Sequence, residues 1–143
     1  MKIERFEDIK AWQEARALAN MIYAAAGSNG RFDSHYRFRE QIQAAGVSVM
    51  SNIAEGFSRR SAREFAQFLF IAKGSVAEVQ SQLYVALDQS YINKAIFDEV
   101  YTKCEQVARL ISGFIKYLLN KDKPQELKEL NKPNKHEQLK EPK

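Results

Sequence analysis

The residues in this sequence that are best suited to chemistry are arginines. Six arginines and no lysine lie between residues 31 and 63, in two groups: Arg31, Arg37 and Arg39, followed by Arg59, Arg60 and Arg63. Guanidinium groups bind phosphate oxygens as bidentate forks. We therefore expect Arg59, Arg60 and Arg63 to be the main contacts to a nucleic-acid backbone, with Arg37 and Arg39 as further contacts. Ordinary surface arginines are the alternative interpretation.

Catalysis has no comparable candidates. His35 lies near a predicted helix start and His136 near the C-terminus, and neither belongs to the Glu-x-x-His pairs that di-metal bundles use. Cys104 falls on an apolar helical stripe, where a buried thiol is inert. No glycine-rich phosphate-binding loop occurs. We predict no catalytic residue, no metal site and no cofactor. An enzyme with a metal in its core is the weakest alternative.

Small and polar residues interrupt two of the apolar helical segments. They form two groups: Ser51, Asn52, Glu55 and Gly56, and then Gly74, Ser75, Glu78 and Gln82. Glycine inside a helix costs about 0.5 to 1 kcal/mol relative to alanine, so Gly46 and Gly74 predict the close approach of another helix. Ser51 and Glu55 share one helical stripe, and Ser75, Glu78 and Gln82, at steps of three and four, share another. Each stripe is either a solvated face or a seam between helices or subunits.

Four helices are predicted to position these side chains. Apolar residues recur at steps of three and four over about 7–27, 34–57, 61–88 and 93–120. All three prolines lie beyond residue 120, so nothing in the helical region breaks a helix. Short links make successive helices antiparallel. The sequence therefore predicts an all-α fold, an antiparallel up-down-up-down four-helix bundle.

Capping and turn residues mark where the predicted helices begin and end. Residues 27–30 place two glycines around Ser and Asn and predict a turn. Asp33 or Ser34 is then positioned to cap the second helix. Ser61 and Glu64 have the spacing of a capping box at the start of the third helix.

Composition indicates one domain over residues 1–120 and a cytoplasmic location. A lone cysteine cannot form an intramolecular disulfide, and the charged first residues lack the apolar run of a signal peptide. No segment reaches the roughly 18 apolar residues of a membrane span. The formal net charge of +4 is too modest to identify a partner. Residues 121–143 contain every proline and few apolar residues, and we predict a disordered charged tail there.

Several runs of the sequence resemble a known family. They are Ser51-Asn-Ile-Ala-Glu-Gly-Phe57, Arg60-Ser61, Glu64-Phe65, Gly74-Ser75, Glu78 and Gln82-Leu83, preceded by Phe6-Glu-Asp-Ile-Lys-Ala-Trp12. Together they resemble the four-helix-bundle proteins encoded by intervening sequences in bacterial 23S ribosomal RNA genes. The resemblance implies a homopentamer with a basic surface. It also implies a similarity to the accessory variability protein of diversity-generating retroelements, which binds nucleic acid and a reverse transcriptase.

Two functional hypotheses follow. The first is a non-catalytic homo-oligomer, a pentamer, that binds RNA or DNA through its arginines or serves as an adaptor. The alternative is a structural oligomer that scaffolds a protein partner without nucleic acid and uses the two polar stripes as its subunit seam. No membrane is expected as a partner under either hypothesis.

Overall fold

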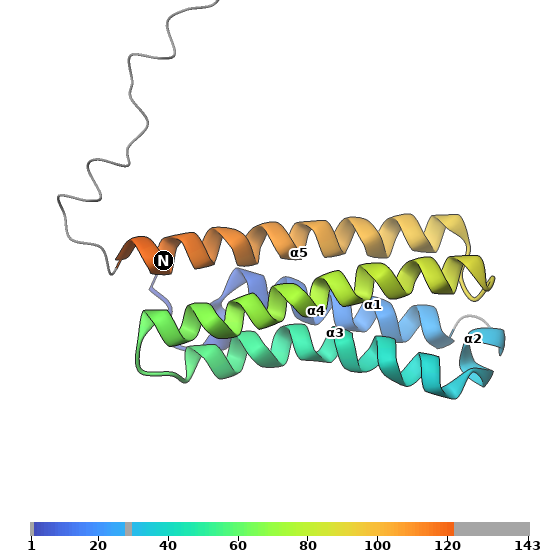
Figure 1. The fold of residues 1–143 in the computed structure, drawn as a ribbon, viewed down its shortest axis with the longest axis horizontal. Coiled ribbons are helices and arrows are strands. Elements are labelled where there is room, and N and C mark those ends of the chain that lie inside the picture. Colours follow the sequence, from blue (N-terminus) through green and yellow to red (C-terminus); the bar gives the residue numbers. More distant parts are fainter. Residues whose placement is uncertain (1, 28–29, 122–143) are drawn as a thin grey trace, which may run out of the picture.

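Four long helices dominate the structure, a computed structural model that describes residues 2–27 and 30–121 (Figure 1). They are α1 (Lys10–Gly27), α3 (Tyr36–Phe57), α4 (Ala62–Asp88) and α5 (Lys94–Lys121). Two short elements join them, the 3-10 helix η1 (Phe6–Asp8) and the helix α2 (Gly30–Ser34). The described residues contain no strand, and the predicted all-α fold is confirmed. Residues 28–29 of the predicted turn and 122–143 of the predicted tail lie outside the described residues.

The long helices close a ring around one core. Helix α3 packs against α4, α4 against α5, and α1 lies against both α3 and α5. Neighbouring helices run in opposite directions (Figure 1). One end of the bundle therefore gathers the N-terminal residues 2–5, the link 58–61 between α3 and α4, and the last turns of α5. We call this the arginine end. Helix α2 and the α4–α5 link lie at the opposite end.

The core is made largely of the predicted apolar stripes. On α4 the whole predicted series is buried: Phe65, Leu69, Ala72, Val76, Val79, Leu83 and Ala86. On α5 the buried residues are Phe97, Val100, Cys104, Val107, Ile111, Ile115 and Leu118, and Phe114 is partly buried. On α3, Val49 and Ile53 are buried, whereas Val47 is 38% exposed and lies outside the core.

The connection between α1 and α3 differs from the prediction. The second helix was expected to begin at Asp33 or Ser34, but α3 begins at Tyr36 and α2 precedes it as a separate helix. His35 is the N-cap of α3, and its side chain makes no capping hydrogen bond. The expected cap by Asp33 or Ser34 is therefore wrong.

Burial of one aromatic ring explains why α2 exists. Phe32 of α2 is only 1% exposed, and its ring centroid lies 5.7 Å from that of Phe38 and 5.6 Å from that of Tyr91. These contacts hold α2 across the end of the core. An isolated five-residue helix is not stable in water, so tertiary packing stabilises this one.

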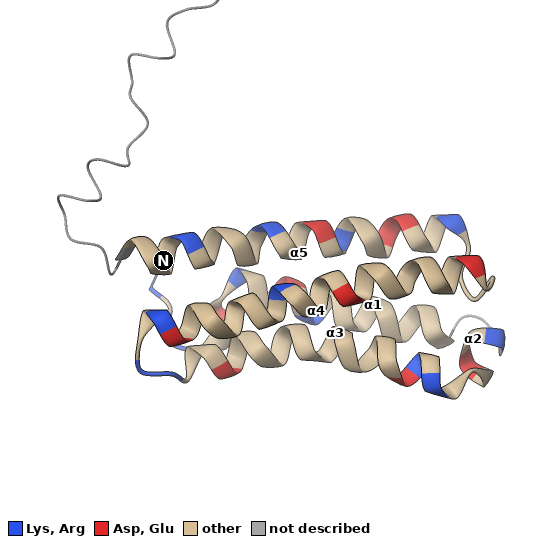
Figure 2. Cartoon of the chain, viewed as in Figure 1, with Lys and Arg blue, Asp and Glu red and all other residues tan. Residues whose placement is uncertain are grey.

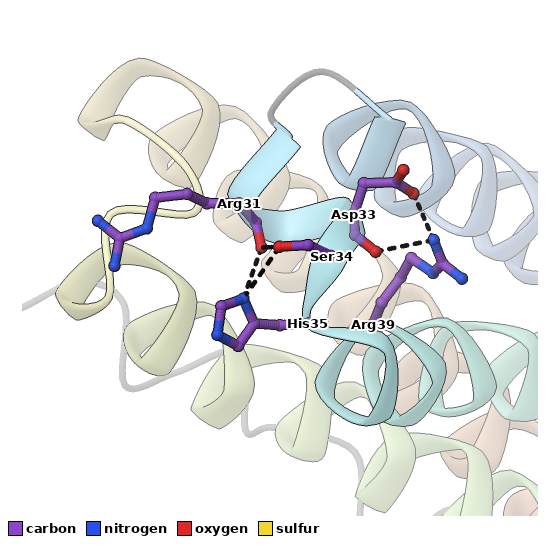
Figure 3. Close-up of polar contacts among 5 residues, drawn as sticks. All are labelled: Arg31, Asp33, Ser34, His35 and Arg39. Atoms are coloured by element: carbon purple, nitrogen blue, oxygen red, sulfur yellow. Dashed lines mark hydrogen bonds and ion pairs between the residues drawn. The ribbon is translucent and has the colours of Figure 1, made fainter.

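The polar side chains at this corner hold α2 against α3 (Figure 3). The guanidinium of Arg39 donates to the Asp33 main-chain oxygen at 3.0 Å and forms an ion pair with the Asp33 carboxylate. Ser34 Oγ donates to the main-chain oxygen of Arg31 at 3.1 Å, and His35 Nδ1 lies 2.7 Å from the same oxygen. Asp33 and Ser34 are thus engaged in the corner and do not cap α3.

Other helix ends follow the sequence signals more closely. Ser61 Oγ accepts a hydrogen bond from the Glu64 backbone N–H at 3.1 Å, which confirms Ser61 as the cap of α4.

A charged cluster joins α1 to α5. Glu14 of α1 accepts hydrogen bonds from Lys10 of the same helix and from Lys103 of α5. These two hydrogen bonds lower the pKa of Glu14.

Candidate nucleic-acid interface

The link between α3 and α4 carries the three arginines predicted as main contacts. Helix α3 ends at Phe57 and α4 begins at Ala62, so the link crosses the arginine end as an exposed segment. Arg59 and Arg60 are exposed in the link, and Arg63 is exposed in the first turn of α4. Figure 2 shows basic residues along the link and the start of α4. The structure therefore brings these three residues to one place.

The three arginines differ in how freely they could bind a phosphate. Arg59 donates to a Glu55 carboxylate oxygen at 2.9 Å, and its guanidinium carbon lies 4.6 Å from the Phe68 ring centroid. Neither Arg60 nor Arg63 forms an ion pair with any residue that the structure describes. An exposed ion pair contributes at most about 1 kcal/mol. Arg59 can therefore exchange Glu55 for a phosphate at small cost, and Arg60 and Arg63 need no exchange.

A surface cavity of about 510 Å³ adjoins the link. Its lining includes three cationic side chains and four aromatic rings: Lys2, Arg59 and Arg60, and Phe57, Phe65, Phe114 and Tyr117. Among the residues that the structure describes, no carboxylate lines it. Ser61 and Ala62, at the start of α4, also contribute to the wall. The cavity thus combines positive charge with aromatic surface.

The aromatic rings of this cavity form a continuous series from α3 to α5. Centroid distances are 6.2 Å between Phe57 and Phe65, 5.2 Å between Phe65 and Phe114, and 6.0 Å between Phe114 and Tyr117. The last pair is stacked, with 29° between the ring planes. Tyr117 is 57% exposed. The series therefore begins in the bundle and ends in a ring that is open to solvent.

The two arginines expected as further contacts lie far from this cavity. Arg37 and Arg39 belong to the first turns of α3, and a helix of this length separates them from the link by about 30 Å. Arg39 is engaged by Asp33 (Figure 3). Arg37 is exposed and forms no ion pair within the described part of the chain. A single chain therefore does not join the two groups of arginines into one surface.

The structure divides the two predicted polar stripes between interior and surface. Three members are buried or partly buried where α3 meets α4: Asn52, Gly56 and Ser75. Four are exposed: Ser51, Glu55, Gly74 and Glu78. Gln82 is partly buried, and its Oε1 has no hydrogen-bond partner among the described residues. The exposed members remain available for contact with another molecule.

The interior members form a polar connection between α3 and α4. Ser75 Oγ lies 2.9 Å from Ser48 Oγ. Asn52 Nδ2 donates to the main-chain oxygen of Ser48 at 2.8 Å and to its Oγ at 3.0 Å. Sequence reasoning missed Ser48, although it lies four residues before Asn52, where helical side chains are neighbours.

Of the two close helix approaches predicted at glycines, the structure confirms one and contradicts the other. A Cβ on Gly46 would lie 2.6 Å from Ile22 Cδ1, which confirms a close approach of α1 at that position. Nothing lies within 4 Å of a Cβ placed on Gly74, so the predicted close approach there is wrong. The close approach of α4 occurs instead at Gly56 of α3, where a Cβ would lie 2.6 Å from Phe65 Cδ2 and 2.8 Å from Phe68 Cβ.

The outer surface of α3 and α4 carries few charges. Helix α3 has none between Glu40 and Glu55, and α4 has only Lys73 and Glu78 in its middle (Figure 2). Four large apolar side chains of these helices are exposed there: Val47, Phe70, Ile71 and Val85. Tyr84 is also exposed, but its ring packs against Phe97 and Tyr101 of α5. Depletion of charge together with exposed aromatic and aliphatic groups is typical of the centre of a protein–protein interface. We call this surface the α3–α4 face.

The remaining chemical candidates have no reactive geometry. Cys104 is completely buried, and this burial raises the pKa of its thiol to about 12. Within residues 2–27 and 30–121, no group of three or more His, Cys, Asp or Glu side chains is arranged to hold a metal ion. None of the described helices has the length and apolarity required to cross a bilayer.

Comparisons with known proteins give a consistent assignment. One crystal structure, of a protein with unknown function from the S23 ribosomal protein family of Bacteroides thetaiotaomicron VPI-5482, superimposes with a TM-score of 0.68 at 19% identity. The match covers 74% of this chain and 95% of the other, and it supports the fold. No curated protein sequence matches the chain. The family model of the 23S rRNA-intervening sequence protein matches residues 7–113. The chain therefore belongs to the 23S rRNA-intervening sequence protein family.

Proposed function

We propose that the protein is a non-catalytic, homo-oligomeric nucleic-acid-binding or adaptor protein of the cytoplasm that contacts phosphate backbones through its arginine end. The observation that carries this proposal is the closeness of two arginines, Arg60 and Arg63, to a cavity lined by cations. Within the described part of the chain, these arginines form no ion pair and no carboxylate lines the cavity. Such an arrangement favours polyanions without reading base edges. The family name refers to 23S rRNA, which makes RNA the first ligand to test.

The proposed oligomer is a ring of five copies, the number that the family resemblance implies. Because a cyclic ring needs two different surfaces in each contact, the α3 part of the α3–α4 face of one copy would pack against the α4 part of that face on the next. The support for this contact is the low charge and the exposed apolar side chains of that face. Cyclic symmetry places the arginine end of every copy at the same height along the ring axis. Each ring then offers several equivalent phosphate contacts to one nucleic acid, so weak individual sites add up through their high effective concentration.

Salt-dependent RNA binding tests the proposal. Fluorescence anisotropy of a labelled RNA is measured against the full chain at increasing salt. Neutralising about three phosphates per subunit predicts a log-log slope of about −2 to −3 for each engaged subunit. Replacing Arg59, Arg60 and Arg63 together by Glu should reduce the affinity at least tenfold and flatten the slope.

The matched control replaces three exposed cations that lie outside both the arginine end and the α3–α4 face, Arg16, Arg31 and Lys94, by Glu, which changes the formal charge equally. This control should keep most of the affinity if the arginine end is the contact, and its native mass should be checked alongside. Absence of RNA and DNA binding by the wild-type chain at low salt contradicts the proposal. Equal binding by the arginine variant and the wild type contradicts it as well.

The alternative is an oligomer that scaffolds a protein partner without nucleic acid. The exposed apolar residues of the α3–α4 face favour it, because they could bind a partner chain as readily as a second copy. A pulldown with and without nuclease separates the two functions. Recovery of a specific protein without nuclease-sensitive material would favour the scaffold.

A further inference from the structure

We propose that the cavity at the arginine end takes one unpaired nucleotide of a nucleic-acid strand, with its base against Tyr117 and its phosphate against Lys2 and Arg60. This inference rests on the proposed function and goes beyond it, because it adds a preference for single strands over duplexes. It assigns a ligand to side chains that backbone contact alone would not require.

The side chains that line the cavity match the chemical groups of a nucleotide. The described lining holds three cations and no carboxylate, which favours an anion, and its four aromatic rings favour a flat ring. A nucleotide has both groups. The volume of about 510 Å³ lies within the roughly 300 to 1,000 Å³ of known small-ligand sites. The lining therefore matches a nucleotide in charge, shape and size.

Tyr117 is placed so that a base could stack on its ring. Its ring is stacked on Phe114 and is more than half exposed, so it can accept another flat ring. Phe114 in turn contacts Phe65 of the core at 5.2 Å. An incoming base would extend this series by one ring, on a support already fixed by the packing of α4 and α5.

A neighbouring cavity lacks the combination of uncompensated cations and several aromatic rings. It measures about 390 Å³ and shares Ile3, Phe114 and Tyr117 with the first cavity. Its lining includes the carboxylate of Asp8 beside Lys10 and Arg109, so its cations are partly compensated. The cavity at the link is therefore the better place for a phosphate.

The surroundings indicate a strand and not a free mononucleotide. Arg63 is exposed, is unpaired among the described residues, and lies outside the lining, where an adjacent phosphate of the same strand could reach it. A base inside a duplex is paired and stacked on both sides and would have to leave the stack to enter a cavity. Loops, bulges and single strands offer such a base without that cost.

The test compares a short single-stranded RNA with a blunt duplex of the same length and uses four forms of the full chain: wild type, Tyr117→Ala, Tyr117→Phe and Tyr23→Ala. Wild type should bind the single strand more tightly. Tyr117→Ala should weaken single-strand binding about tenfold, since stacking on one base contributes that much, and should leave duplex binding unchanged. Tyr117→Phe should bind like wild type because it retains the ring.

Tyr23→Ala is the matched control, because Tyr23 is 52% exposed on α1 and does not line the cavity. It should bind both RNAs like wild type. Unfolding midpoints of all forms show whether the fold is intact, and Tyr117→Phe keeps the test informative if Tyr117→Ala is destabilised. As a second measurement, photo-cross-linking of a 5-bromouridine single strand should label the α5 segment that contains Tyr117.

Three outcomes overturn the inference. In the first outcome, Tyr117→Ala binds the single strand as tightly as wild type, while the variant with Arg59, Arg60 and Arg63 changed to Glu loses binding. This outcome contradicts the nucleotide site but not the proposed function. A cross-link found only outside α5 has the same meaning. Failure of the wild type to bind either RNA removes both proposals.

Discussion

At the scale of single residues, two helical glycines occupy opposite environments. A Cβ on Gly56 would overlap Phe65 and Phe68, and one of the overlapping atoms is the Cβ of Phe68, which cannot move without its backbone. A Cβ on Gly74 would meet open space. The two positions therefore form a matched pair for the same substitution.

We expect Gly56→Ala to destabilise the fold and Gly74→Ala to stabilise it. Overpacking at Gly56 costs about 1 to 3 kcal/mol and outweighs a helix-propensity gain of about 1 kcal/mol. At Gly74 only the gain remains. Urea unfolding of both variants at one protein concentration measures the difference in unfolding free energy. A Gly56→Ala variant as stable as Gly74→Ala would show that the helices separate easily at the link.

Residue types and spacing could predict part of the candidate site. The arginine cluster at the α3–α4 link was visible because its members are adjacent in sequence. Lys2 and Tyr117 were not predicted, because the cavity joins the N-terminal segment to the end of α5, more than a hundred residues away. Spacing along one helix carries no information about such a meeting. The position of Gly74 was misjudged because an interior glycine indicates low side-chain volume and does not say which face it occupies.

At the scale of elements, α3 and α4 are joined by a polar contact inside an apolar interface. Ser75 is buried and Ser48 is partly buried, and their Oγ atoms lie 2.9 Å apart. A buried hydroxyl that loses its partner keeps the cost of desolvation. The hydrogen bond therefore fixes the relative position of the two helices in addition to stabilising them.

A double-mutant cycle of Ser48→Ala and Ser75→Ala tests this contact. Each single variant should lose about 1 kcal/mol, and the double variant should lose less than the sum, with a coupling of about 0.5 to 1.5 kcal/mol. Ser51→Ala, on the exposed side of α3, is the control and should change stability by less than about 0.5 kcal/mol. Additive single losses in the cycle would mean that water already satisfies both hydroxyls.

The four long helices were predicted because three- and four-residue periodicity extends over many turns of each. Helix α2 was not predicted, because a single turn has no periodicity to detect. It depends on the burial of Phe32 against Phe38 and Tyr91, which come from different parts of the chain. The helix caps show the same difference between local and distant contacts. Ser61 was predicted because it bonds within its own helix, whereas the Asp33 carboxylate forms an ion pair with Arg39 and does not cap α3.

At the scale of the whole molecule, the α3–α4 face is the surface on which assembly should depend. Five chains of 16.5 kDa give a particle of about 82 kDa. We expect Ser81→Arg, on the exposed side of α4, to lower the native mass, because an unpaired charge in the centre of an interface is costly. Thr102→Arg, exposed on the charged helix α5, should leave the mass unchanged.

Native mass spectrometry of the two variants and the wild type checks this prediction. A wild-type chain that is monomeric over the accessible concentration range would contradict the oligomer. Dissociation by Thr102→Arg with retention of the oligomer in Ser81→Arg would move the interface from the α3–α4 face to α5.

The position of the N-terminal segment has a practical consequence for anyone who purifies this protein. Lys2 and Ile3 form part of the cavity wall at the arginine end, so an affinity tag fused before Met1 would emerge beside the surface proposed to hold RNA. A polyhistidine tag there could obstruct the cavity or attract nucleic acid by itself. The α4–α5 link lies at the opposite end of the bundle, and its exposed residue Gln89 is a better place to attach a dye, whereas Tyr91 and Ile92 of the same link are buried and must be left intact.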